Sequence, residues 1–391
     1  MKDIVSAEEI KRRFNLDLRH SRTLGSIMKA ILDGQTVKLS KISQYVKEDI
    51  REESVYRKLQ RFIGKVELNE DVCADMIMKT LGIPENEEVI LILDRTYWMH
   101  GNKHLNFLYL SVYYRGYAIP IYFKIMPDMK GHSSVEDRRE LLEKFIQQFG
   151  KEKIAYIVAD REFDGGEWLG YLDGLGIYYV QRLKEKNICM TNARGEYVPA
   201  ASLCHHLKPL EKECFGKRRI YKSRGFTTYI TAAKNAKNKV LLLAHSPQIK
   251  DPTKAYGTRW SIECGFRAMK SGGFNMHETG VTATNKLTTL FRIIAILTAI
   301  THKMGILIDE IQPIKLKSHK RKAISYIQLA IILIFRILNT SFKFPLSLRP
   351  IIPKLKLFPL NFFEFCRVRY FYSICSSTSK YKHCTTTHFS H

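Results

Sequence analysis

The sequence predicts an α/β fold, and three observations lead to this prediction. Two continuous runs of Val, Ile and Leu each end in an aspartate, an aromatic hairpin follows the first run, and a helical segment precedes the second. Apolar runs that do not alternate with polar residues are typical of strands buried on both faces of a sheet. We expect a catalytic core with a β-rich insertion, flanked by an N-terminal helical domain and a C-terminal helical and basic region.

Composition limits the classes of partner. The chain has 391 residues, and its 63 Lys and Arg against 38 Asp and Glu give a net charge of +25. Such a charge favours a polyanionic partner, either nucleic acid or an anionic membrane. The most apolar stretches, residues 290–300 and 323–338, are short or interrupted by arginine, so we expect no membrane partner. The N-terminus lacks the apolar core of a secretory signal, which predicts a cytoplasmic protein.

The eight cysteines are scattered without a paired framework, as expected where thiols stay reduced. Cys366, Cys375, Cys384 and His388 are conceivable zinc ligands, but no C-x2-C pair is present. We therefore interpret the eight cysteines as free thiols.

Residues 1–85 form the expected N-terminal helical domain. Between residues 36 and 64, apolar residues recur at helical spacing around a polar break, which predicts two short helices. The second helix would carry a basic face, formed by Ser54, Tyr56, Arg57, Lys58 and Arg61. A helix-turn-helix presents such a face to DNA, and an ordinary amphipathic helical pair fits the pattern equally well. This domain is a candidate for DNA binding.

The first part of the predicted core spans residues 86–175 and places two aspartates at strand ends. We expect a strand over 87–94 that ends at Asp94, followed by an antiparallel hairpin over 104–114 and 117–125. A helix over 133–149, capped by Ser133 or Ser134, should come next. A strand over 153–160 then ends at Asp160. Asp164 competes with Asp160 for the same role, but we expect it to cap the helix that follows.

Residues 176–246 contain several short β-like runs and form the predicted insertion. The second part of the core, residues 247–310, contains a predicted helix over 252–272. Tyr256, Arg259 and Glu263 are three and then four residues apart, so they share one face of this helix, and Lys270 follows two turns later. A long helix over 282–308 should support it.

The C-terminal region, residues 311–391, holds 14 Lys and Arg and one acid, a net charge of +13. Its final residues show no periodicity, so we expect a basic and partly disordered region that could lie on DNA.

Three acids in this arrangement suit metal-dependent phosphodiester chemistry. Two Mg2+ ions roughly 4 Å apart activate the nucleophile and stabilise the leaving oxygen. Mg2+ prefers hard oxygen ligands, so carboxylates converging from separate elements suffice to hold it. Asp94, Asp160 and Glu263 supply such a set, although each acid alone has an ordinary structural explanation as a strand end or a solvated helix residue.

Four residue types at fixed spacing carry a family resemblance. The segment from Tyr256 to Lys270 matches Y-(2)-R-(3)-E-(6)-K, and residues 158–165 and 91–96 read VADREFDG and LILDRT. Together these resemble the DDE transposases of the bacterial insertion-sequence-four group. The resemblance covers roughly residues 36–310 and implies an RNase H-like catalytic core.

The resemblance also implies roles for six residues. Asp94, Asp160 and Glu263 would be catalytic and bind two Mg2+ ions, with Mn2+ as a substitute. Tyr256, Arg259 and Lys270 would contact phosphates of double-stranded DNA, at the inverted repeats and the target. The implied chemistry is cut-and-paste transposition by a homodimer, with nicking, hairpin formation and opening, and strand transfer. A nuclease of the same fold and a non-catalytic DNA-binding derivative of a transposase are the alternatives.

Overall fold

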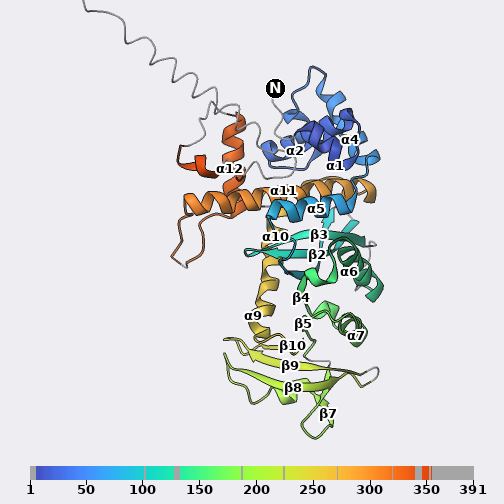
Figure 1. The fold of residues 1–391 in the computed structure, drawn as a ribbon, viewed down its shortest axis with the longest axis vertical. Helices are drawn as coiled ribbons and strands as arrows, with labels where there is room; N and C mark the ends of the chain where they lie inside the picture. Colours follow the sequence, from blue (N-terminus) through green and yellow to red (C-terminus); the bar gives the residue numbers. More distant parts are fainter. Residues whose placement is uncertain are drawn as a thin grey trace, which may run out of the picture. The chain divides into compact units, whose positions relative to one another are not determined.

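The computed structural model describes residues 6–100, 103–126, 133–185, 188–222, 225–270, 272–318, 320–339, 346–351 and 354. The chain divides into two compact units, one built from Pro84–Arg267 and the other from Met1–Ile83 with Ala268–His391 (Figure 1). The cysteines and histidine weighed as zinc ligands, and the tail expected to be disordered, lie outside the described residues.

The unit Pro84–Arg267 contains a ten-stranded sheet in the order β3-β2-β1-β4-β5-β10-β9-β8-β6-β7, as far as its residues are described. The strands are β1 (Val89–His100), β2 (Lys103–Tyr114), β3 (Tyr117–Met126), β4 (Ile154–Ala159), β5 (Tyr179–Arg182), β6 (Cys189–Thr191), β7 (Tyr197–Pro199), β8 (Lys212–Ile220), β9 (Phe226–Lys234) and β10 (Val240–His245). A large sheet with helices confirms the mixed α/β class predicted from the sequence.

The sheet joins the predicted core and the predicted insertion. The β2–β3 hairpin is antiparallel, as its turn residues predicted, and β4 is parallel to both β1 and β5. The strands from residues 176–246 continue the same sheet, because β10 pairs antiparallel with β5 and then with β9.

The prediction that the first strand ends at Asp94 is wrong, because β1 continues to His100. Its antiparallel partner β2 offers hydrogen bonds along that whole length, from Leu91 opposite Val112 to His100 opposite Lys103. The parallel ladder with β4 is shorter and stops at the Leu93–Ala159 pair. Asp94 and Asp160 are therefore both the first residue beyond this parallel ladder.

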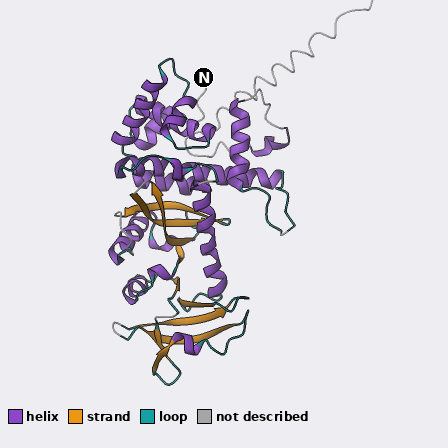
Figure 2. Cartoon of the chain, turned by 180° about the vertical axis from the view of Figure 1, so that it is seen from behind, coloured by secondary structure: helices purple, strands orange, loops and turns teal. Residues whose placement is uncertain are grey.

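Helices lie on both sides of the sheet (Figures 1 and 2). One side carries α6 (Val135–Phe149) and α7 (Gly166–Gly174), and the other carries α9 (Pro252–Gly257) and α10 (Ser261–Lys270). The short helices are α8 (Ala200–Leu203) and the 3-10 turns η2 (Lys151–Lys153), η3 (Arg161–Phe163) and η4 (Thr258–Trp260). Ser134 caps α6 in a capping box with Asp137, as one of the two predicted caps.

The single helix predicted over residues 252–272 is instead α9, η4 and α10 in succession. The Thr258 hydroxyl donates to the Ala255 carbonyl at 2.7 Å, and such a local bond competes with regular α-helical bonding. The backbone nevertheless stays in the right-handed helical region at Gly257, Thr258 and Ser261. The chain therefore keeps one helical course through a tighter turn.

Apolar contacts fix α10 and α9 against the sheet. Ile262 of α10 packs with Ile92 of β1 and Ala118 of β3, and Ala255 of α9 packs with Val180 and Leu243. The α10 backbone approaches β3 closely at Gly265, where an added Cβ would lie 2.3 Å from the Ala118 carbonyl oxygen.

The unit formed by Met1–Ile83 with Ala268–His391 is helical in its described part. Its helices are α1 (Ala7–Phe14), α2 (Leu18–Gly34), α3 (Leu39–Ile42), α4 (Glu52–Lys65), α5 (Glu70–Leu81), α11 (Thr284–Ile311) and α12 (Tyr326–Asn339), with the 3-10 turns η1 (Ser43–Tyr45), η5 (Met276–Glu278) and η6 (Leu346–Ile351). By length and composition, α11 could cross a membrane, but 89% of its most apolar window is buried, as in the core helix of a globular unit.

We predict that Gly265→Ala destabilises the unit Pro84–Arg267 by about 1 to 3 kcal/mol, since the methyl group overlaps the Ala118 carbonyl. Chemical denaturation followed by circular dichroism measures this. Gly257→Ala is the matched control, because a Cβ there meets nothing within 4 Å and should stabilise the helix by about 0.5 to 1 kcal/mol. Equal effects of the two substitutions would contradict the close approach.

Candidate active site

Asp94 faces the helices because of strand alternation. It lies two residues after Ile92, whose side chain packs against Ile262 of α10, and residues i and i+2 of a strand share a face. Asp94 is only 8% exposed. One of its carboxylate oxygens accepts a hydrogen bond from the Arg95 backbone N–H at 2.7 Å.

Asp160 is held where β4 ends. Its Oδ1 accepts hydrogen bonds from the Arg161 backbone N–H at 2.8 Å and from the Tyr256 hydroxyl at 2.9 Å. Its main-chain carbonyl accepts from Gln181 Nε2 at 2.6 Å. The side chain and the backbone of Asp160 are therefore both fixed by neighbouring elements.

Arg259 of η4 contacts all three predicted acids. Its Nη1 lies 2.6 Å from Asp94 Oδ2, and its Nη2 lies 3.9 Å from Asp160 Oδ2 and 3.8 Å from Glu263 Oε1. The guanidinium also lies over the Tyr256 ring, with Cζ 5.9 Å from the ring centroid. Residues separated by as many as 169 positions in sequence thus meet around one cation.

Burial raises the pKa of both aspartates and Arg259 lowers it, but the net shift differs between the two. Burial raises the pKa of Asp94 to about 6, although the charge of Arg259 opposes this rise. Burial also raises the pKa of Asp160, but Arg259, the Arg161 N–H and the Tyr256 hydroxyl outweigh it and leave the pKa below its usual value. For Tyr256 itself, burial is the main cause of a pKa raised to about 12.

Five of the six predicted site residues therefore lie together in the unit Pro84–Arg267: Asp94, Asp160, Tyr256, Arg259 and Glu263. Lys270 is the last residue of α10, seven positions after Glu263, and belongs by its contacts to the other unit. Burial lowers the pKa of Lys270.

The three carboxylates surround the guanidinium and do not form a compact cage of their own. Among the described residues, no three His, Cys, Asp or Glu side chains lie close enough together to hold one metal ion. Three carboxylates without a cation repel one another, which disfavours a compact cage. The guanidinium between them offsets this repulsion. Carboxylates are nevertheless the type of ligand that a hard divalent ion prefers.

Sequence reasoning missed Arg182, whose Nη1 lies 3.7 Å from Asp160 Oδ1. Arg182 ends β5, the strand next to β4, so an arginine at the end of a neighbouring parallel strand was the available signal.

The capping role predicted for Asp164 is wrong. Gly165 precedes α7, and the Asp164 carboxylate instead accepts hydrogen bonds from the Lys184 N–H at 3.2 Å and from the Tyr221 hydroxyl.

A comparison with known protein families covers part of this site. Residues 116–300, a little under half of the chain, match the family model for the transposase DDE domain, and this match supports a transposase of the DDE class. The matched range includes Asp160, Arg259 and Glu263. No curated protein matches the sequence. Among solved structures, one match is a piggyBac transposase synaptic complex with hairpin DNA, with a TM-score of 0.41 and 11% identity, covering 86% of this chain and 75% of that chain.

We predict that Asp94→Asn gains stability relative to the unchanged protein as pH rises. The pKa of Asp94 is raised to about 6 in the folded chain, above its usual value of 3.8. Between these two pKa values, Asp94 is protonated in the folded chain and ionised in the unfolded chain. The contribution of Asp94 to the free energy of unfolding therefore falls as pH rises through this range. From about pH 4.5 to about pH 7.5, the difference between the two proteins should shift by about 2 kcal/mol in favour of the variant. Denaturation curves at the two pH values test this, and a pH-independent difference would contradict it.

Proposed function

We propose that the chain is a DDE transposase of the insertion-sequence-four group, which cleaves DNA at the ends of an insertion sequence and joins them to target DNA. The observation that carries this proposal is the meeting of Asp94, Asp160 and Glu263 around Arg259. The match to the transposase DDE domain supports the class, and the spacing of Tyr256, Arg259, Glu263 and Lys270 supports the group.

Asp94, Asp160 and Glu263 are the residues that would hold two Mg2+ ions, with Mn2+ as a substitute. When bound, such ions activate a water or 3′ hydroxyl and stabilise the leaving oxygen of the phosphodiester. Asp94 and Asp160 are fixed by the Arg95 and Arg161 N–H groups, which orients the carboxylates without filling their remaining lone pairs. Glu263 is more exposed, with a side chain 40% accessible, so it can adjust its position.

Arg259 and Tyr256 would orient the DNA. A planar guanidinium binds phosphate oxygens through bidentate hydrogen bonds. Arg259 can therefore exchange its carboxylate partners for a phosphate of the DNA backbone. Tyr256 holds Asp160 through its hydroxyl, which keeps this carboxylate in place when Arg259 moves. Lys270 would supply a further cation for the same DNA strand.

The remaining parts of the proposal follow from the group. The catalytic core would be RNase H-like, and the reaction would proceed by nicking, hairpin formation, hairpin opening and strand transfer. A homodimer would hold two inverted-repeat ends of double-stranded DNA in the bacterial cytoplasm. The net charge of +25 supports a DNA partner.

We predict that Glu263→Gln lowers cleavage and strand transfer by at least about a hundredfold, because a metal ligand is lost, and leaves DNA binding intact. The assay uses a labelled duplex carrying the element's end together with target DNA. Glu152→Gln is the matched control, since Glu152 is an exposed acid at the opposite end of β4. Undiminished cutting by Glu263→Gln would assign the third ligand elsewhere. Cut but never joined product from the unchanged protein would indicate a nuclease of the same fold.

We also predict that Arg259→Gln binds Mn2+ at least several-fold more tightly in the absence of DNA and cleaves DNA more slowly. The guanidinium competes with a metal ion for the same three carboxylates, so its removal frees them. Isothermal titration with Mn2+ measures the affinity. Weaker Mn2+ binding by this variant would mean that Arg259 positions the carboxylates and does not compete with the ion.

A further inference from the structure

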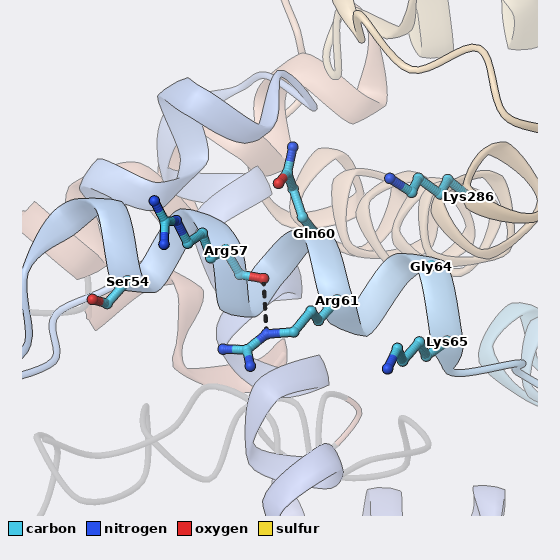
Figure 3. Close-up of a pocket in the computed structure, with 7 residues that line it drawn as sticks. All are labelled: Ser54, Arg57, Gln60, Arg61, Gly64, Lys65 and Lys286. Carbon is cyan, nitrogen blue, oxygen red and sulfur yellow. Dashed lines mark hydrogen bonds between the residues drawn. The ribbon is translucent and has the colours of Figure 1, made fainter.

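The helical unit contains a cationic groove between α4 and the start of α11. Two adjoining pockets of about 670 and 280 Å3 form it, and both are lined by Gln60 and Lys286. The larger pocket is also lined by Ser54, Arg57, Arg61, Gly64 and Lys65 (Figure 3). The smaller pocket is also lined by Lys38, Tyr56, Thr279 and residues 280–283. We call this surface the α4–α11 groove.

The cations of the α4–α11 groove follow one helix face. Arg57, Arg61 and Lys65 are four residues apart on α4, which places them on one exposed stripe with a rise of about 6 Å per step. Lys286 of α11 lines the same pocket. Arg57 pairs with Glu53, whereas Arg61, Lys65 and Lys286 have no carboxylate within 4.0 Å in the described part of the chain. Their charges are therefore available to an anionic partner.

Hydrogen bonds between α11 and α4 preorganise this groove. Asn285 Nδ2 donates to the Gly64 carbonyl at 2.9 Å, and the Thr289 hydroxyl donates to the Val66 carbonyl at 3.0 Å. A Cβ at Gly64 would lie 3.2 Å from Lys286 Cε, so the glycine leaves room for the lysine stem to pass. The two walls of the groove are thus held together before any ligand arrives.

Hydrogen-bond donors without partners among the described residues lie beside the smaller pocket. Ala283 precedes α11 and provides no side-chain cap, so the first N–H groups of this 28-residue helix remain available to an anion. Thr279 lines the same pocket and is 3% exposed, and its buried hydroxyl has no hydrogen-bond partner among the described residues. A buried hydroxyl without a partner is unfavourable unless a ligand satisfies it.

We propose that the α4–α11 groove binds the backbone of duplex DNA, with one phosphate at the start of α11 and its neighbours along Arg57, Arg61 and Lys65. The donors recognise phosphate oxygens, so this contact is independent of base sequence. None of the described residues that line the groove is an acid that could assist cleavage, so the groove would hold DNA and not cut it. The proposal rests on DNA being the partner in the proposed function, but uses none of the residues around Arg259.

The test measures the affinity for a fluorescent duplex of arbitrary sequence, in chelator without metal ions, by anisotropy over a series of KCl concentrations. Lys286→Gln should weaken binding about five- to tenfold at low salt and reduce the salt slope by about 1, because one phosphate contact is lost. Thr279→Val should weaken binding up to about tenfold with little change of slope, since it removes a hydrogen bond and no charge.

Two matched controls separate binding from folding. Lys11→Gln removes an exposed charge on α1, outside the groove, and should leave the slope unchanged. Thr80→Val replaces another buried hydroxyl without a partner, at 3% exposure on α5, and should leave the affinity unchanged. Both valine variants should keep or raise the melting temperature, so weaker binding by Thr279→Val alone would not be an effect of unfolding.

The outcomes distinguish this proposal from the proposed function. Equal DNA affinity of the groove variants and the unchanged protein overturns the groove, even where the protein still cleaves and joins DNA. Groove-dependent DNA binding without any cleavage by the unchanged protein supports the groove and counts against the transposase. Groove-dependent binding to vesicles with anionic lipid, together with groove-independent DNA binding, would assign the groove to a membrane and overturn the proposal.

Discussion

The candidate active site depends on one guanidinium, that of Arg259, placed among three carboxylates. Three acids at a site this enclosed repel one another, and a cation between them offsets that repulsion. The balance differs at each acid. Asp94 is the most deeply buried, so its pKa is raised in spite of Arg259, whereas Asp160 accepts further hydrogen bonds and its pKa is lowered. The same environment thus prepares two neighbouring carboxylates to respond differently to protons and to cations.

The convergence of the acids follows from where the β1–β4 ladder stops. Parallel pairing ends at Leu93 and Ala159, so the next residue of each strand is an aspartate at the same edge. Apolar packing of Ile262 on Ile92 then brings α10, and with it Glu263, to that edge. The polar centre is therefore positioned by apolar contacts next to it.

The sequence predicted much of this site because the relevant signals are local. Apolar runs, a two-residue turn and helical spacing depend on near neighbours, so the strands, the hairpin and the shared face of Arg259 and Glu263 could be predicted. The length of β1 could not, because β2 sets it from the other side of a turn. Arg182 and the true partners of Asp164 were missed for the same reason, since both depend on which strands become neighbours in space. The α4–α11 groove joins segments more than 200 residues apart, which no local pattern reveals.

The charge of the site also bears on how the protein could hold DNA. Among the ion pairs of the described residues, the three carboxylates Asp94, Asp160 and Glu263 outnumber the two guanidinium groups that pair with them, those of Arg259 and Arg182. These five side chains together therefore carry no excess of positive charge to attract a polyanion. The long-range attraction expected from a net charge of +25 must then come from other surfaces. The α4–α11 groove offers unpaired cations together with free backbone donors, and such donors bind phosphate at short range while the cations act over longer distances. Affinity for DNA and the chemistry on DNA would then reside in different units of the chain, so each could be altered by substitution without loss of the other.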